Sequence, residues 1–412
     1  MTQPEQITVQ NWKKSITLFL GGQTISLFGS ALVQYAIMWY ITLTTQSGIM
    51  MTISIICGFV PTFFLSPFGG VWADRYNRKL LIISADSMIA ISTLILAILF
   101  LNGYDSMWLL FVISAIRAIG TGIQTPAVGA ILPQIVPADQ LTKVNGANGS
   151  IQALVMLLAP IASAGLLSVT TIEVIFFIDV ITAAIAVLIL LLFLKVPLHE
   201  KAQEAHTTGY FSDFKAGLSY INHHAFLKKF FIFFAMFLIL AAPAAFLTPL
   251  QVTRSFGANE WYLSAIEIAF SIGMMIGGIV IASWGGFKNK THTMTISAFG
   301  FGIGTVLLGI VPVFWVYLIV MAIVGVVMPM FNTPATVLLQ EKVEPDYLGR
   351  VFGVLTMIST SVMPLGMLIF GPLADIVDIE WLLIGTGVLL FLLGFFLLGS
   401  KVLMEAGKPD IE

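Results

Sequence analysis

The chain is organised around the stretch Gly69-Gly70-Val71-Trp72-Ala73-Asp74-Arg75-Tyr76-Asn77-Arg78-Lys79, a short charged turn between two apolar runs. The runs cover residues 49–71 and 80–101, and a helix of roughly 20 apolar residues crosses a hydrocarbon core. Adjacent glycines let two helices approach closely, and an Asp-Arg pair stands where the chain leaves the apolar region. The stretch therefore predicts two membrane-spanning helices joined by a turn at the membrane surface.

Composition places the whole chain in a membrane. The 412 residues are 58% hydrophobic and only 10% charged, whereas a soluble domain carries about 25% charged residues. We therefore predict an all-α integral membrane protein. The net charge of −2 provides no basic surface for nucleic acid. The single cysteine, Cys57, lies within an apolar run, which excludes disulfides within the chain and cysteine metal sites.

The apolar runs predict 12 transmembrane helices, at residues 15–43, 48–72, 79–101, 106–134, 144–168, 172–195, 226–252, 260–284, 291–311, 313–340, 351–376 and 381–401. The first run lacks a small-residue cleavage site, so we expect a transmembrane helix there and not a removed signal peptide. Of the 19 Lys and Arg residues, all except Arg117 and Arg254 fall on the side of the N-terminus. The positive-inside rule then predicts that both termini are cytoplasmic.

The longest polar segment, residues 196–225, divides the spans into two sets of six. Apolar residues recur at helical spacing within 212–221, which predicts a short amphipathic helix on the membrane surface with Ser212 as its N-cap. We therefore expect an N-terminal six-helix bundle at 1–195, a cytoplasmic linker at 196–225 and a C-terminal bundle at 226–412.

The two halves resemble each other in sequence. Three pairs of segments match at an offset of 207 or 208 residues: 123–127 with 331–335, 139–146 with 346–353, and Gly69-Gly70 with Gly277-Gly278. Repeated six-helix halves are typical of transporters whose site lies near the bilayer midplane. The repeat predicts two pseudo-symmetric six-helix bundles.

The combination of repeat and turn resembles the major facilitator superfamily. The resemblance rests on Gly70, Asp74-Arg75 and Arg78-Lys79 after the second span. The family's turn has Gly where this chain has Asn77, and Asn is another residue that tolerates a left-handed conformation. The second copy of the turn keeps the glycines but lacks the Asp-Arg pair.

A narrower likeness is to the macrolide-efflux (Mef-type) exporters of Gram-positive bacteria. Its residues are Gly22-Gln23, Ser26-Leu27 and Gln34 in span 1, Arg117-Ala118-Ile119-Gly120-Thr121 and Thr125-Pro126-Ala127 in span 4, Val136-Pro137, Gln140-Leu141-Thr142-Lys143, and Ile178-Asp179-Val180. Siderophore exporters of enteric bacteria are more distant relatives. In span 5, residues 155–164 lack the glycines of the antiporter signature found in many drug exporters.

The resemblance implies a conformational gate. It places Asp74 near Arg350 at the cytoplasmic start of span 11, in a contact that would hold the halves together when the protein opens outward. Arg75, Arg78 and Lys79 belong to the same predicted gate. The alternative for the last two is a solvated turn that obeys the positive-inside rule.

Four charged residues within the spans are expected to couple protons or charge to transport: Arg117, Asp179, Glu267 and Asp86. An arginine near mid-membrane costs at least ~2.5–3.5 kcal/mol, so Arg117 needs a partner or a wet cavity. With Asp179 it forms either a structural ion pair or a proton-coupled site. Glu267 is a candidate proton or substrate-cation site, and Asp86 is expected to pair with the 69–79 turn.

Span 1 carries four polar residues at spacings of three and four, namely Gln23, Ser26, Ser30 and Gln34. This spacing places them on one helix face. The face serves either helix packing or the wall of a substrate cavity that offers hydrogen bonds.

Together these features predict a secondary active transporter that exports amphipathic drugs, macrolide-like or of several classes, by proton antiport with alternating access. One alternative is export of a siderophore, lipid-like or other native metabolite. Another is a non-transporting receptor or scaffold, against which the duplicated halves argue. No ATP-binding, catalytic or metal-ligand motif is present, so we expect no enzyme, cofactor or metal site. The expected partners are a small amphipathic substrate, protons and the lipid bilayer, and we expect a monomer in the bacterial inner membrane.

Overall fold

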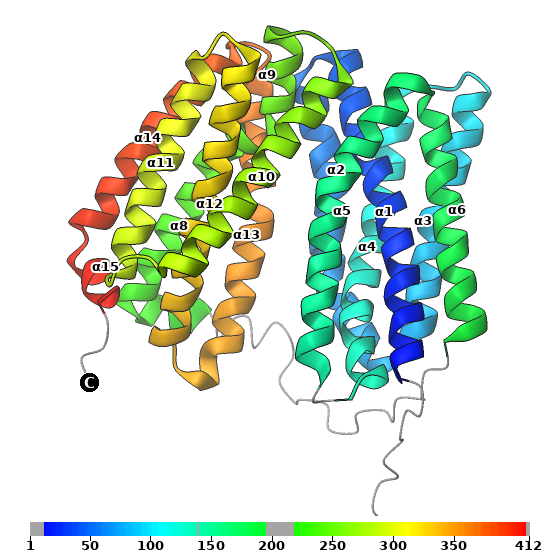
Figure 1. The fold of residues 1–412 in the computed structure, drawn as a ribbon, viewed down its shortest axis with the longest axis horizontal. Coiled ribbons are helices and arrows are strands. Elements are labelled where there is room, and N and C mark those ends of the chain that lie inside the picture. The colour runs from blue at the N-terminus through cyan, green and yellow to red at the C-terminus, as the bar shows by residue number, and fades with distance from the viewer. Residues whose placement is uncertain (1–11, 138–139, 195–217, 409–412) are drawn as a thin grey trace, which may run out of the picture. The chain divides into compact units, whose positions relative to one another are not determined.

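The computed structural model describes residues 12–137, 140–194 and 218–408, and long helices account for nearly all of them (Figure 1). Twelve of these helices are long and apolar enough to cross a membrane. The expected all-α fold with 12 spans is therefore confirmed. The first six spans are α1 (Trp12–Thr45), α2 (Gly48–Arg75), α3 (Arg78–Leu101), α4 (Met107–Ile135), α5 (Leu141–Val169) and α6 (Ile172–Phe193).

The remaining helices are α8 (Ala225–Phe246), α9 (Thr248–Ser255), α10 (Glu260–Trp284), α11 (Lys290–Ile310), α12 (Phe314–Lys342), α13 (Pro345–Leu373), α14 (Ile379–Gly399) and α15 (Lys401–Ala406). The seventh predicted span is interrupted at Leu247, between α8 and α9. Pro249 follows the interruption and lacks the N–H that would continue the hydrogen bonds of α8.

Two compact units make up the chain. The first contains residues 1–38 and 57–205, and the second contains residues 39–56 and 206–412. The end of α1 and the beginning of α2 thus belong to the second unit. Residues 196–217 of the predicted linker, including Ser212, lie outside the described residues, while residues 218–223 are helical. The domain division at 196–225 stays a prediction.

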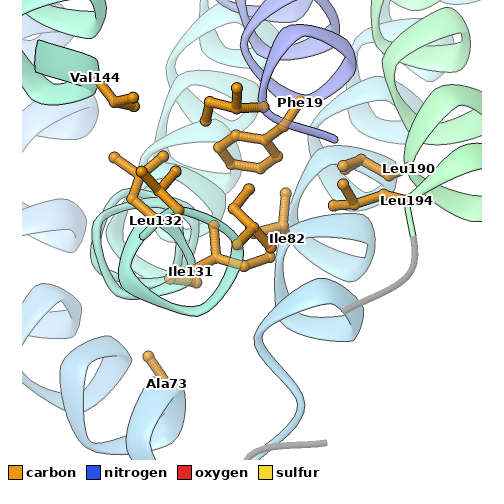
Figure 2. Packing of buried hydrophobic residues seen from close by; sticks show 12 residues of the cluster. Phe19, Ala73, Ile82, Ile131, Leu132, Val144, Leu190 and Leu194 are labelled. Carbon is orange, nitrogen blue, oxygen red and sulfur yellow. The ribbon is translucent and has the colours of Figure 1, made fainter. Parts of the chain in front are cut away.

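A buried apolar cluster fills one end of the first unit, and all six of its helices contribute (Figure 2). Phe19 from α1 and Ile82 from α3 lie among Ile131, Leu132 and Leu190, and all five are 3% exposed or less. Ala73, within the 69–79 turn, belongs to the same cluster. The turn is thus attached to the packed core of this unit.

Two glycines of the sequence repeat have the same structural role. A Cβ atom on Gly69 would collide with the backbone of Gly122 in α4, and one on Gly277 would collide with the backbone of Val326 in α12. In each unit a glycine therefore lets the second helix of its half touch the backbone of the fourth. This shared contact explains the first glycine of each repeated pair, whereas a Cβ atom on Gly70 or Gly278 would meet nothing within 4 Å.

Candidate functional site

The 69–79 turn is fastened to the ends of neighbouring helices. Arg78 is buried, and its guanidinium donates to the carbonyl oxygens of Ala73 at 2.8 Å and Ala130 at 2.7 Å. Lys79 Nζ donates to two carbonyl oxygens at the end of α6, 3.2 and 2.8 Å away. A cation there satisfies carbonyl groups without helical partners and complements the helix dipole. Both residues therefore stabilise the first unit and are more than solvated charges.

Asn77 caps α3 and does not form a left-handed turn. Its φ is −65°, and its side-chain oxygen accepts a hydrogen bond from an N–H of the first turn of α3. The tolerance of asparagine for a left-handed conformation is not used here, because an N-cap has extended backbone angles. Arg75 is exposed, and the side chain of Asp74 lies outside the described part of the structure. The Arg350 guanidinium lies 5.5 Å from the centre of the Tyr347 ring. A contact between Asp74 and Arg350 stays a prediction.

Arg117 and Asp179 form a buried ion pair within the first unit. Asp179 is fully buried, and its carboxylate also accepts hydrogen bonds from the hydroxyls of Ser30 at 3.1 Å and Thr93 at 3.2 Å. Arg117 donates to the Thr93 hydroxyl and, at 3.2 Å, to the Ser30 carbonyl oxygen. Residues from α1, α3, α4 and α6 therefore surround the pair. This geometry is that of a structural ion pair, and a role in proton transfer stays a prediction.

Asp86 lies in a second buried cluster and has no ionic partner. It is 2% exposed, and its Oδ1 accepts a hydrogen bond from Gln124 Nε2 at 2.6 Å. The same nitrogen lies 3.5 Å from Gln23 Oε1. Within the described residues, Asp86 Oδ2 and Gln23 Nε2 are buried without a hydrogen-bond partner. The expected pairing of Asp86 with the 69–79 turn is wrong, because eight residues of helix, about 12 Å, separate it from Arg78.

Glu267 in α10 is half-buried and makes no hydrogen bond or ion pair with the part of the chain that the structure describes. Ser264, one turn earlier, is fully buried, and its hydroxyl has no partner there either. The predicted role of Glu267 as a proton or substrate-cation site stays a prediction. Across residues 12–137, 140–194 and 218–408, no group of three His, Cys, Asp or Glu side chains could hold a metal ion.

The four polar residues of α1 occupy different environments. Gln23 is half-buried beside Gln124, and Ser26 is 3% exposed. Ser30 donates to Asp179, and Gln34 is exposed. The structure therefore joins Gln23 to the Asp86 cluster and Ser30 to the Arg117–Asp179 pair. A shared role of the four in a substrate cavity stays a prediction.

Sequence reasoning missed a polar cluster at the start of α2. The Asp375 carboxylate accepts hydrogen bonds from the backbone N–H groups of Gly48 at 2.7 Å and Ile49 at 2.9 Å, and from the Ser47 hydroxyl at 2.8 Å. Arg254 donates to the same carboxylate at 2.9 Å. The free N–H groups and the dipole of a helix N-terminus favour an anion at this place. Asp375 is thus both a helix cap and an ion-pair partner.

Arg254 also binds the backbone around Asp375. It donates to the carbonyl oxygen of Gln46 at 2.6 and 3.2 Å and to that of Ala374 at 2.5 Å. Among the described non-glycine residues, only Gln46 has a positive φ, 47°. All members of this Arg254–Asp375 cluster belong to the second unit. One sequence feature could have drawn attention to this cluster: Arg254 is the one basic residue predicted on the outer side.

The Arg254–Asp375 cluster is expected to resist moderate acid. Partial burial alone would raise the pKa of Asp375, but hydrogen bonds from Ile49, Gly48, Ser47 and Arg254 more than offset it, so its pKa is lowered. A lowered pKa means that the stabilisation is complete above the ordinary carboxyl pKa, about 3.9, and is lost as pH falls below it. Asp375→Asn should therefore destabilise the protein by roughly 0.5–1 kcal/mol, a range reduced for partial exposure.

The measurement is the difference in melting temperature between wild type and Asp375→Asn from pH 8 to pH 3. The difference should stay constant down to pH 5 and shrink below pH 4. Asp378→Asn is the matched control, since the Asp378 side chain makes no cap hydrogen bond. A difference that already disappears between pH 7 and pH 5 would show that the carboxylate is not held as described.

Comparison with known proteins identifies the class. A model of the Major Facilitator Superfamily matches residues 16–367, and the chain belongs to this superfamily. Macrolide efflux protein A of Streptococcus pyogenes is 30% identical over 404 residues, which cover 98% of this chain and 99% of the relative. The predicted resemblance to both groups is confirmed. The chain is a multi-pass membrane transporter with moderate similarity to macrolide efflux proteins.

More distant matches agree with this class. The staphyloferrin A transporter of Staphylococcus aureus is 22% identical over 402 residues, which cover 95% of this chain and 98% of the relative. The crystal structure of the nucleoside transporter NupG superposes with a TM-score of 0.71 at 16% identity, covering 94% of this chain and 98% of that one. A likeness at this level of identity shows the fold alone.

Proposed function

We propose that this transporter exports amphipathic drugs of the macrolide type, or several drug classes, in exchange for protons. The observation that carries the substrate class is the similarity to macrolide efflux protein A over nearly the whole length of both chains. We place the protein in a bacterial inner membrane with both termini cytoplasmic, as the positive-inside rule predicts. In this orientation the 69–79 turn and Arg350 lie on the cytoplasmic side, where they would control alternating access.

Proton coupling in this proposal depends on carboxylates without counter-charges. Asp179 is neutralised by Arg117, whereas Asp86 is buried and Glu267 half-buried without an ion pair in the described chain. A carboxylate in such a place is stable when it is protonated or binds a cation. We therefore assign proton exchange first to Asp86, with Glu267 as a second carrier. The Arg117–Asp179 pair supports the helices around Asp86.

Everted membrane vesicles test this function. With an acidic lumen, vesicles containing the protein should accumulate erythromycin above the level of protein-free membranes. One proton per cycle down a pH gradient equivalent to about 100 mV supplies ~2.3 kcal/mol, which corresponds to roughly 50-fold accumulation. A protonophore should remove the accumulation. Uptake that the protonophore leaves unchanged would exclude proton drive, and absence of uptake would exclude macrolide export.

Export of a siderophore, lipid-like or other native metabolite is the second candidate, because the staphyloferrin A transporter is similar over 95% of this chain. Asp86 and Glu267 argue against a polyanionic substrate, because each would have to release its proton beside bound negative charge in a low-dielectric site. Competition in the vesicle assay separates the two. A tricarboxylate siderophore should not reduce erythromycin uptake if the drug-export proposal holds.

A further inference from the structure

We propose that Asp86, Gln23 and Gln124 form a binding subsite for a protonated amine that carries a neighbouring hydroxyl group. This proposal rests on the export function and adds the chemistry that the transporter recognises in its substrate. The three side chains come from α3, α1 and α4 of the first unit.

The unmatched atoms of the cluster define the ligand. Gln124 Nε2 donates a hydrogen bond to Asp86 Oδ1 at 2.6 Å and lies 3.5 Å from Gln23 Oε1. This arrangement leaves an acceptor, Asp86 Oδ2, and a neutral donor, Gln23 Nε2, both buried and without a close hydrogen bond in the described residues, although the Gln23 side chain faces Asp86. Leaving such groups unmatched in a buried place is unfavourable, so a ligand that satisfies them is stabilised. A ligand that inserts between them and satisfies both brings a cationic donor and a neutral acceptor close together.

No cationic side chain within the described residues pairs with Asp86. The titratable residues of α3 and of the helices around it, α1, α4 and α6, are Lys13, Lys14, Tyr35, Tyr40, Arg78, Lys79, Arg117, Glu173 and Asp179. Arg117 pairs with Asp179, and Arg78 and Lys79 donate to backbone carbonyls. Lys13 and Lys14 lie in the first turn of α1, about 14 Å along the helix from Gln23. The counter-charge must therefore come from a proton or a bound ligand.

The donor set favours an organic cation over a metal ion. A metal ion such as Na⁺ or Ca²⁺ requires several oxygen ligands, whereas Gln23 presents its amide nitrogen here as the unmatched group. Gln23 and Gln124 are half-buried, and Thr121 and Thr125, adjacent to Gln124 on α4, are exposed. The buried Asp86 carboxylate is thus next to two amide side chains that are partly exposed at the surface of the first unit. An amphipathic amine can contact all three groups from that side.

Binding to the purified full-length protein tests the subsite with three probes. Propranolol has a protonated amine and an adjacent hydroxyl, its deoxy analogue has only the amine, and N-acetylpropranolol has only the hydroxyl. Asp86→Asn should weaken binding of the two amines roughly 10- to 100-fold, as expected for a charged hydrogen bond, and leave the N-acetyl probe unchanged. Gln23→Met should remove only the preference for propranolol over its deoxy analogue, a factor of roughly 3–10.

The control variant is Glu341→Gln, which removes a carboxylate paired with Lys290 at 2.9 Å and should keep wild-type affinities. Equal propranolol binding by wild type and Asp86→Asn would overturn the subsite. Lower melting temperatures of both variants with unchanged affinities would also overturn it. Gln23 and Asp86 would then stabilise the fold without binding a ligand. Wild-type binding of amines without vesicle uptake would count against export while the subsite stands.

Discussion

Replacement of Asp179 by Asn is expected to destabilise the protein by about 3–5 kcal/mol, because it leaves Arg117 buried without a counter-charge. Asp179 is 0% exposed, and Arg117 is 8% exposed. An asparagine can still accept hydrogen bonds from Ser30 and Thr93 but cannot neutralise the guanidinium. The result should be a large fall in the melting temperature of the purified protein.

The double variant Arg117→Met, Asp179→Leu separates charge from packing. Replacing both members of a buried pair with apolar residues is often neutral, so this variant should regain most of the lost stability. Thr93→Val is a milder control, since it removes a hydroxyl partner of both charges and should cost about 1 kcal/mol. An Asp179→Asn protein as stable as wild type would show that the pair is loosely held and would make Asp179 a candidate for proton exchange.

Asp86→Asn is expected to abolish accumulation driven by a pH gradient. Asparagine keeps the hydrogen bond with Gln124 but cannot bind and release a proton. At saturating erythromycin, gradient-driven uptake should therefore fall at least tenfold, to the level measured without a gradient. Substrate counterflow should persist, because exchange of labelled for unlabelled substrate requires alternation of the transporter but no net proton movement.

Two variants make this result specific. Glu341→Gln should accumulate substrate like wild type, because its carboxylate is paired with Lys290 outside the proposed site. Glu267→Gln shows whether the second carboxylate contributes. Full gradient-driven uptake by Asp86→Asn would contradict the assignment and move proton exchange to Glu267 or to the Arg117–Asp179 pair.

Apolar periodicity predicted most of the fold because the membrane imposes a simple length requirement. The span predicted at 260–284 coincides with α10, Glu260–Trp284. The break at Leu247 was missed because proline is tolerated in membrane helices, and pattern alone does not show where the backbone stops its hydrogen bonds. The capping role of Asn77 was missed for a similar reason, since asparagine serves both left-handed turns and helix caps.

The polar contacts were less predictable because they join residues far apart in the sequence. Arg117 within an apolar run required a partner, and that requirement pointed to Asp179. Asp375 gave no such signal, because it follows a span as an ordinary polar residue. Its contacts with Arg254 and with the N-terminus of α2 arise only when α2, α9 and α13 meet. Asp86 could be placed in a span, but its unmatched oxygen is a property of the packing alone.

Proton movement driven by substrate tests antiport most directly. Proteoliposomes that contain a pH-sensitive dye and start without a pH gradient receive erythromycin on the outside. The account predicts that the lumen becomes alkaline faster than in protein-free liposomes, because protons leave as substrate enters, and that Asp86→Asn liposomes match the protein-free rate. The contradicting result is that the wild-type protein takes up substrate while the lumenal pH changes only as in protein-free liposomes. That result would exclude proton-coupled export.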